Sequence, residues 1–165
     1  MRSLEDAGVK VRGCDVVVLG AGGAARGVCW ALKRAGAKVA VWNRTPERAR
    51  ELAEEFKLEA FVTDDLLFNA VEGSSGLVNT TSVGLENPNE SPLEDHLLPS
   101  DWVCDIVYRP LETKLLRNAR EHGIRTVDGL GMLVHQGALA LEAWTGRTVQ
   151  SEIMRRAALE ALGEA

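Results

Sequence analysis

One short stretch constrains the fold of this chain more than any other: a glycine-rich turn between an apolar run and a helical pattern. Residues 16–19 are rich in β-branched valine, which favours a strand. Residues 24–35 then place apolar side chains at helical spacing, and Gly36 ends the pattern. A strand, a tight glycine turn and a helix in this order predict a β-α-β unit, and therefore a parallel sheet.

Short apolar runs and helical patterns alternate along the rest of the sequence, which is typical of a parallel sheet with helices on both faces. Five further strands are predicted at residues 39–42, 61–63, 76–79, 102–107 and 125–127. Further helices are predicted from Pro46 to about Phe56 and at residues 113–122, 132–144 and 150–162. No linker, repeat or low-complexity tract divides the chain. We therefore expect one domain over residues 1–165, an α/β Rossmann-type doubly wound sheet of six parallel strands.

The composition excludes several classes of function. The net charge is −5, which gives no general attraction to nucleic acid or to an anionic membrane surface. No apolar run approaches the roughly 20 residues of a membrane helix. The three cysteines form no CxxC pair, and the three histidines have no carboxylate or cysteine at ligand spacing, so we expect no disulfide and no metal. The expectation is a cytoplasmic protein whose four tryptophans pack in the core.

The glycine-rich turn has the residues that a dinucleotide site requires. Gly20 allows the tight turn, Gly22 lets the backbone approach a pyrophosphate, and Ala25 is the third small position, where helix and sheet pack closely. The helix that follows presents free backbone N–H groups to the phosphates. The predicted phosphate contacts are Gly20, Ala21, Gly22, Gly23 and Ala24. The alternative is a turn that serves the fold alone.

The residues after the second predicted strand indicate which dinucleotide is bound. NAD-binding domains carry an acid there, which hydrogen-bonds the ribose 2′-hydroxyl. This chain has Asn43, Arg44 and Thr45 instead, with Arg48 one helical turn further on. Guanidinium groups attract the 2′-phosphate that an acid would repel. We therefore predict NADP(H) as the cofactor, although Arg48 alone is also compatible with a solvated surface residue.

Further segments are expected at the same edge of the sheet, because parallel strands end together there. Thr80 and Thr81 follow the predicted strand at residues 76–79, and their hydroxyls either line the cofactor or cap a loop. Tyr108 follows the next strand and either reaches a ligand or packs as an aromatic residue. Gln136 lies early in a helix that starts at this edge, where its amide can bind a hydroxyl group.

These motifs together resemble the C-terminal domain of shikimate dehydrogenase, and the resemblance covers nearly the whole chain. The general motifs, which recur in many NADP-binding proteins, are Gly20-Ala-Gly-Gly-Ala-Ala-Arg26 and Asn43-Arg-Thr45. The specific ones are Asp105-x-x-Tyr108-x-Pro110-x-x-Thr113-x-Leu115-Leu116 and Gly129-Leu-Gly-Met-Leu-Val-x-Gln136. The family reduces 3-dehydroshikimate to shikimate with NADPH in aromatic amino-acid biosynthesis, so the resemblance implies an oxidoreductase.

The resemblance also implies which residues contact each ligand. The glycine turn contacts the pyrophosphate, and the 2′-phosphate is held by Asn43, Arg44, Thr45 and Arg48. Ile106 and Gly129 are expected beside the nicotinamide. Tyr108 and Gln136 are expected to touch the substrate, shikimate or 3-dehydroshikimate.

In that family the catalytic lysine and aspartate lie on an N-terminal substrate domain, in segments that resemble N-V-T-x-P-x-K and N-T-D-G-x-G-F. Neither segment occurs in this sequence. We therefore expect a fragment that binds cofactor, packs against the substrate domain in the complete enzyme, and is inactive alone, because the groups that transfer the proton are missing. Alternative assignments are a quinate dehydrogenase, a glutamyl-tRNA reductase and a stand-alone NADP-sensing module.

Overall fold

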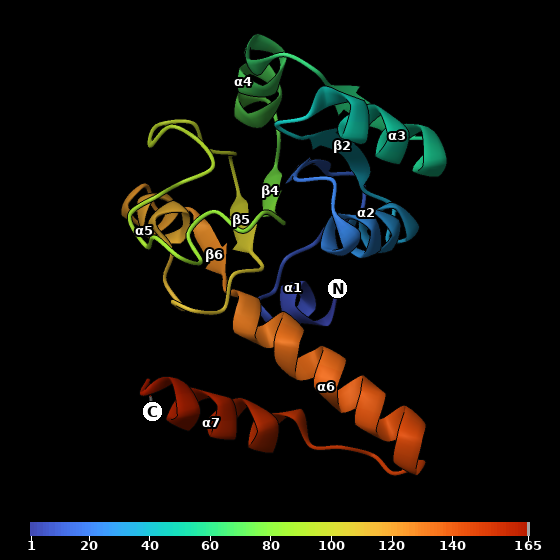
Figure 1. The fold of residues 1–165 in the computed structure, drawn as a ribbon, viewed down its shortest axis with the longest axis vertical. Helices are drawn as coiled ribbons and strands as arrows, with labels where there is room; N and C mark the ends of the chain where they lie inside the picture. The colour runs from blue at the N-terminus through green and yellow to red at the C-terminus, as the bar shows by residue number, and fades with distance from the viewer. Residues whose placement is uncertain (165) are drawn as a thin grey trace.

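The computed structural model describes residues 1–164 and contains one six-stranded sheet (Figure 1). The strands are β1 Asp15–Leu19, β2 Lys38–Trp42, β3 Glu59–Phe61, β4 Gly76–Asn79, β5 Trp102–Asp105 and β6 Arg125–Val127. All neighbours pair in parallel, in the order β3-β2-β1-β4-β5-β6. The order runs outward in both directions from β1 and β4, which confirms the predicted doubly wound Rossmann-type fold.

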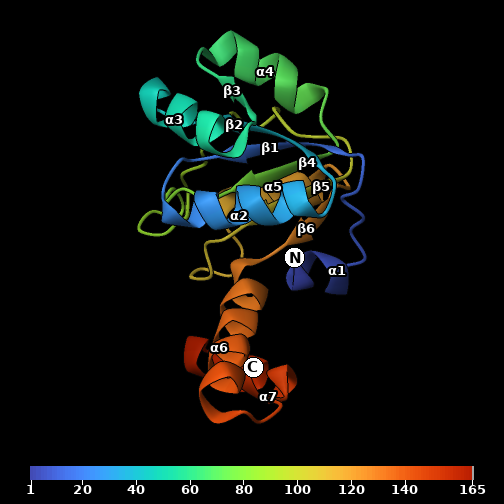
Figure 2. The same cartoon turned by 90° about the vertical axis from the view of Figure 1, so that its right-hand side faces the viewer.

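Helices cover both faces of the sheet, and one helical pair leaves it. The helices are α1 Arg2–Asp6, α2 Gly23–Arg34, α3 Pro46–Phe56, α4 Asp64–Glu72, α5 Lys114–Glu121, α6 Gly129–Thr145 and α7 Ser151–Leu162. Figures 1 and 2 show α6 and α7 projecting away from the sheet, side by side. None of the helices in residues 1–164 combines the length and apolar character needed to span a lipid bilayer.

Alternating side chains of β1 divide the core into two layers. Val16 and Val18 pack with apolar residues of α2 and α3 on one face. Val17 and Leu19 pack with residues of α4 and α5 on the other. A strand covered on both faces reads as a continuous apolar run, as the sequence of β1 does. The carboxyl end of β1, which carries the glycine turn, is therefore held by the core from both sides.

The structure adds two helices that the sequence analysis does not predict, α1 and α4. Thr63 begins α4 by accepting a hydrogen bond from the Leu66 N–H, and Asp64 and Asp65 occupy the first turn. A capping residue followed by acids is a helix-start signal, so α4 was accessible to sequence reasoning. Because Thr63 belongs to this cap, β3 lies at Glu59–Phe61 and not at 61–63.

The expectation that all four tryptophans pack in the core is wrong for two of them. Trp102 is only 3% exposed, but Trp30 is 52% and Trp144 81% exposed. The Arg34 guanidinium lies over the Trp30 ring, 4.9 Å from its centroid, so Trp30 is covered by a cation and not by the core. Trp144 lies near the end of α6, on the projecting helical pair.

Candidate functional site

The carboxyl ends of four strands lie side by side at one edge of the sheet. The register pairs Leu19 with both Trp42 and Asn79, and Asn79 with Asp105. The strand order reverses between β1 and β4, and open α/β sheets bind ligands in the crevice beside such a reversal. The segments that follow these strands therefore form the candidate site.

The turn after β1 requires glycine at its first position for two independent reasons. Gly20 has φ +103°, a conformation that side chains disfavour. A Cβ there would also lie 2.6 Å from Thr80 Oγ1. The Thr80 hydroxyl itself donates to the Leu19 carbonyl at 2.6 Å. The glycine turn is thus held directly against the exit of β4, across the strand reversal.

The N-terminus of α2 has no side-chain cap. Gly22 is its N-cap residue, and its first turn holds no acid. By contrast, Thr63, Thr113 and Asp128 cap α4, α5 and α6 with side-chain oxygens. A Cβ added at Gly22 or Gly23 would meet nothing within 4 Å. Free N–H groups facing open space fit the pyrophosphate of a dinucleotide.

Two cations without an acidic partner follow β2. Arg44 and Arg48 are exposed, and neither forms an ion pair within residues 1–164. Asn43 Nδ2 donates to the Thr45 carbonyl at 3.0 Å and so fixes the turn that carries them. Thr45 is the N-cap residue of α3, yet its hydroxyl makes no capping hydrogen bond. The two guanidinium groups and the unused hydroxyl fit a second phosphate.

A buried carboxyl group lies at the other end of this edge. Asp105, the last residue of β5, has 0% of its surface exposed. Its Oδ1 accepts hydrogen bonds from Asn79 Nδ2 and the Val107 N–H, both at 3.0 Å, and its Oδ2 accepts one from Thr113 Oγ1 at 2.8 Å. Burial raises the pKa of this carboxyl from 3.8 to about 6, against the lowering effect of the hydrogen bonds. No basic side chain pairs with it in the described part of the chain.

The hydrogen bonds of Asp105 continue into the neighbouring segments. Asn79 Oδ1 accepts from the N–H and from the hydroxyl of Thr81, at 3.0 and 2.7 Å. Thr113 Oγ1 also caps α5 by accepting from a backbone N–H at 3.3 Å. The hydroxyl groups of Thr80 and Thr81 both donate hydrogen bonds within the protein, so they hold the wall of the crevice in place.

Gly129 brings the start of α6 against the turn after β5. A Cβ at Gly129 would lie 2.2 Å from the Ile106 carbonyl oxygen and 2.6 Å from that of Val107. Asp128 caps the same helix by accepting from two backbone N–H groups at 3.0 and 3.3 Å. Only glycine permits this approach, which places Ile106 and Gly129 in contact although 22 residues lie between them in the sequence.

Tyr108 and Gln136, the two predicted substrate contacts, are both exposed. Tyr108 is 41% exposed and follows the turn after β5. Gln136 is exposed about two turns into α6. Both residues are therefore accessible to a ligand from solvent.

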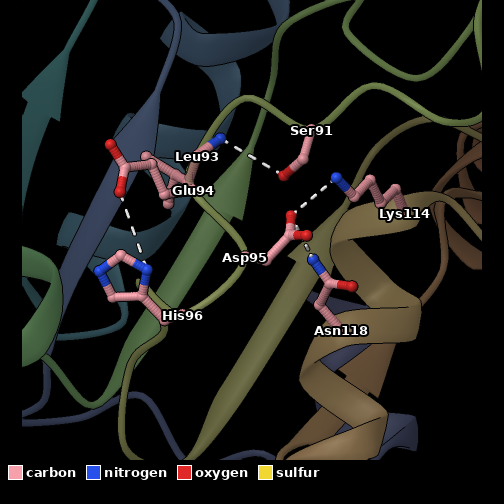
Figure 3. Close-up of polar contacts among 7 residues, drawn as sticks. All are labelled: Ser91, Leu93, Glu94, Asp95, His96, Lys114 and Asn118. Atoms are coloured by element: carbon pink, nitrogen blue, oxygen red, sulfur yellow. Dashed lines mark hydrogen bonds and ion pairs between the residues drawn. The ribbon is translucent and has the colours of Figure 1, made fainter.

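The long return from β4 to β5 is fastened to α5 by polar contacts (Figure 3). Asp95 accepts hydrogen bonds from Lys114 Nζ at 2.8 Å and from Asn118 Nδ2 at 3.0 Å. The hydrogen bond from Lys114 lowers the pKa of Asp95. His96 pairs with Glu94 on the same segment at 3.7 Å. These contacts involve none of the candidate site residues, so this cluster serves the fold.

The Asp105 contacts escape the sequence analysis, although a usable signal is present. β4 and β5 are apolar except at their last residues, Asn79 and Asp105. Polar groups that end adjacent buried strands must satisfy each other, because unpaired buried groups are costly. The pairing becomes evident only once β4 and β5 are known to be neighbours.

The fold and the site define the class of this protein: a Rossmann-type α/β domain with the geometry of a dinucleotide-binding edge. Residues 3–81 match the family model of shikimate / quinate 5-dehydrogenase, and residues 129–159 match that of the shikimate 5′-dehydrogenase C-terminal domain. The two matches together cover more than half of the chain. The chain belongs to the shikimate dehydrogenase family.

Individual relatives agree with this assignment. The chain is 48% identical over 164 residues to a shikimate dehydrogenase (NADP(+)) of one Thermus thermophilus strain, covering 99% of this chain and 60% of that protein. The crystal structure of shikimate 5-dehydrogenase from another strain of this species, in complex with NADP(H) and shikimate, matches with a TM-score of 0.90 at 45% identity, over 98% of this chain and 60% of that one. A quinate dehydrogenase from Corynebacterium glutamicum in complex with NAD matches with a TM-score of 0.88 at 30% identity, over 96% and 59%. The chain thus spans about 60% of the length of the curated relatives it matches.

Proposed function

We propose that residues 1–165 form a single domain that binds NADP(H) and is the cofactor-binding part of a shikimate dehydrogenase, which reduces 3-dehydroshikimate to shikimate with NADPH. One observation carries the proposal: an uncapped helix N-terminus at Gly22 adjoins a strand end with two arginines, Arg44 and Arg48, that have no acidic partner within residues 1–164. This combination fits both phosphate groups of NADP. Family membership and a relative bound to NADP(H) support it.

The glycine turn and the first turn of α2 bind the pyrophosphate through backbone N–H groups. Its contacts in this proposal are Gly20, Ala21, Gly22, Gly23 and Ala24. The open space at Gly22 and Gly23 lets the phosphate oxygens come within hydrogen-bonding distance of the backbone.

The turn after β2 binds the adenosine 2′-phosphate. Arg44 and Arg48 provide charge-assisted hydrogen bonds, which are roughly twice as strong as neutral ones. Thr45 adds its free hydroxyl, and Asn43 holds the turn. The positive end of the α3 dipole favours the same anion. These groups select NADP(H) over NAD(H), because the unphosphorylated ribose offers them no charge to bind.

The other end of the edge receives the nicotinamide, and the bound cofactor supplies the hydride. The contacting backbones of Ile106 and Gly129 form one surface for the ring. Thr80 and Thr81, with their hydroxyls engaged, line the opposite side of the crevice. Their internal hydrogen bonds keep that wall in one arrangement.

Tyr108 and Gln136 contact the substrate but transfer no proton in this proposal. Their exposed phenol and amide hydrogen-bond substrate hydroxyl groups and so orient the reacting carbon. The lysine and aspartate segments that the family resemblance implies for proton transfer do not occur in this sequence. We therefore expect this chain to bind cofactor without catalysing the reaction.

The projecting pair of α6 and α7 is the surface proposed for the substrate domain. No residue of α7 is buried. Large exposed apolar side chains on the two helices are Leu133, Leu139, Leu141, Trp144 and Ile153. Asp6 of α1 joins His135 of α6 at 2.8 Å, so the first residues of the chain also lie beside this surface. Apolar groups exposed in this number favour a protein partner.

We also infer a reducing, cytoplasmic setting. Cys14, Cys29 and Cys104 are all free thiols. Burial raises the pKa of Cys29 and of Cys104 to about 12, so both stay protonated and unreactive. Free thiols throughout the described residues are typical of proteins from reducing compartments.

An absorbance assay for NADPH formation with shikimate and NADP⁺ tests the proposal. We expect no turnover by this chain, and turnover by a version extended upstream through the lysine and aspartate segments, because general acid–base help contributes roughly 10²- to 10⁴-fold and the missing domain also positions the substrate. Activity of the short chain would refute the fragment assignment. Inactivity of the extended chain with shikimate, but activity with quinate, would favour the quinate enzyme that the family description also names.

A further inference from the structure

Asp105 lies too deep to touch a cofactor or a substrate, yet it connects two segments of the proposed cofactor site. Its carboxyl group is fully buried between the ends of β4 and β5. Burial of a carboxyl group without a cation is unfavourable unless hydrogen bonds compensate for the lost hydration, and three donors to Asp105 do so. The hydrogen bonds of Asp105 are therefore the property that distinguishes it from a packing residue.

On one side, Asp105 holds the segment after β4. Its Oδ1 accepts from Asn79 Nδ2, and the amide so oriented turns its own oxygen toward Thr81, whose N–H and hydroxyl both donate to it. Thr80, between them, packs so closely on Gly20 that a Cβ there would lie 2.6 Å from its hydroxyl oxygen. The orientation of one amide thus sets the wall of the crevice beside the glycine turn.

On the other side, the same oxygen holds the segment after β5. Oδ1 accepts from the Val107 N–H at 3.0 Å, which fixes the bend after Ile106. Gly129 contacts this bend, and the position of its missing Cβ lies 2.2 Å from the Ile106 carbonyl oxygen. Tyr108 follows directly. One carboxylate oxygen therefore accepts hydrogen bonds from both segments.

We propose that Asp105 is a positioning residue for hydride transfer, whose Oδ1 sets residues 80–81 and residues 106–108 at a fixed spacing on the two sides of the nicotinamide ring. The inference rests on the proposed NADP(H) site and concerns its nicotinamide end alone. Asp105 acts through Asn79 and Val107 and touches neither ligand. The phosphate end at Arg44 and Arg48 has no hydrogen bond to this network.

The two oxygens of Asp105 allow a discriminating set of variants. Asp105→Ala removes the bonds to both segments. Asp105→Asn keeps one acceptor oxygen for Asn79 and Val107 and turns an amide toward Thr113, so it is the conservative variant that rescues positioning. Thr113→Val removes only the Oδ2 bond and the α5 cap, and it is the matched control for lost stability.

The experiment measures the two ends of the cofactor separately in this chain. Adenosine 2′,5′-bisphosphate probes the phosphate end, and NADPH, followed by its nicotinamide fluorescence, probes both. We expect Asp105→Ala to bind the bisphosphate within about twofold of the unmodified chain, to bind NADPH about tenfold more weakly, and to lose the fluorescence change of bound NADPH. Asp105→Asn restores both NADPH readouts, and Thr113→Val leaves them unchanged.

Unchanged NADPH affinity and fluorescence in Asp105→Ala would overturn the inference, and so would equal losses for both probes. If Asp105→Ala does not fold, Asn79→Ala must show the same selective loss, since it removes the link to Thr81 while Asp105 keeps its other two donors. An unmodified chain that binds neither probe refutes the proposed function, and this inference with it.

Discussion

The two ends of the candidate cofactor edge are built in different ways. The phosphate end consists of residues close together in the sequence, the half-buried Asn43 and the exposed Arg44, Thr45 and Arg48. The nicotinamide end joins segments that follow different strands, through the buried carboxyl of Asp105 and the backbone contact of Gly129. One end is local and solvated, and the other is assembled by the fold.

This difference predicts how each end responds to substitution. An exposed side chain that contacts only a ligand can be removed with little effect on the free energy of unfolding. A buried backbone contact has no such freedom, because close-packed interiors transmit any change in volume to their neighbours. Variants at the phosphate end should therefore change affinity, and variants at the nicotinamide end should first change stability.

The largest expected effect is at Gly22, where the two ends meet on the pyrophosphate. Gly22→Val should abolish NADPH binding, a loss of more than about 100-fold, because a branched side chain fills the space needed by the phosphate. The domain should stay folded, since a Cβ at Gly22 meets nothing within 4 Å. Calorimetric titration and a thermal melt measure the two outcomes. Unchanged affinity for NADPH would mean that the glycine turn serves the fold and does not bind the cofactor.

Gly129→Ala should produce the largest loss of stability. Its Cβ would lie 2.2 Å from a backbone oxygen that cannot rotate away, so the start of α6 must separate from the bend after β5. Overpacking of this kind lowers the free energy of unfolding by about 3 kcal/mol. Urea unfolding measures this loss in the free energy of unfolding.

Gly27→Ala is the matched control for that experiment, because it makes the same change at an exposed position of α2 where the added Cβ meets nothing within 4 Å. It should raise the free energy of unfolding by about 0.5 to 1 kcal/mol, since glycine is a poor helix residue. Similar effects of both substitutions would mean that the contact at Gly129 is not tight.

The same contrast explains what the sequence predicts and what it does not. Runs such as residues 16–19 and 76–79 predict strands from their own residues. The glycine turn and Arg44 indicate phosphate binding through residues that are adjacent in the sequence. Their prediction needs no knowledge of which strands are neighbours. The α/β fold and the candidate phosphate contacts therefore follow from the sequence alone.

The contacts of Asp105 and Gly129 depend on distance in space between residues far apart in the chain. Asp105 meets Asn79 only because β4 and β5 pair in one register. The role of Gly129 becomes evident only from the backbone atoms of Ile106 and Val107 that lie against it in the structure. The exposure of Trp144 has the same origin, because periodicity does not reveal that α6 leaves the sheet.

The buried carboxyl should give the chain a distinct dependence of stability on pH. The pKa of Asp105 is raised from 3.8 to about 6, so between these values the native state binds more protons than the unfolded chain. The free energy of unfolding therefore falls as the pH rises through this window, by roughly 2 to 3 kcal/mol, and the loss is complete above it.

Urea unfolding of the unmodified chain and of Asp105→Asn between pH 4 and pH 7 measures this effect, because the amide does not titrate. The difference between the two proteins in free energy of unfolding should show the whole pH dependence expected for Asp105. Asp95 does not mask it: its pKa is lowered by Lys114, so its contribution is present above 3.8 and is lost only at more acidic pH. Parallel curves for the two proteins would show that the Asp105 carboxyl is not perturbed.

A 2′-phosphate site that is complete within this chain is the central feature of the proposed function, and calorimetric titration with NADPH and NADH tests it. The unmodified chain should bind NADPH more tightly than NADH. Arg44→Ala should weaken NADPH binding by about tenfold or more, the equivalent of about 1.5 kcal/mol for one charge-assisted contact, and leave NADH nearly unchanged. Arg50→Ala, whose guanidinium lies near Glu47 on the same helix, is the matched control and should change neither. Equal weakening of both cofactors by Arg44→Ala, or tighter binding of NADH by the unmodified chain, would contradict this assignment.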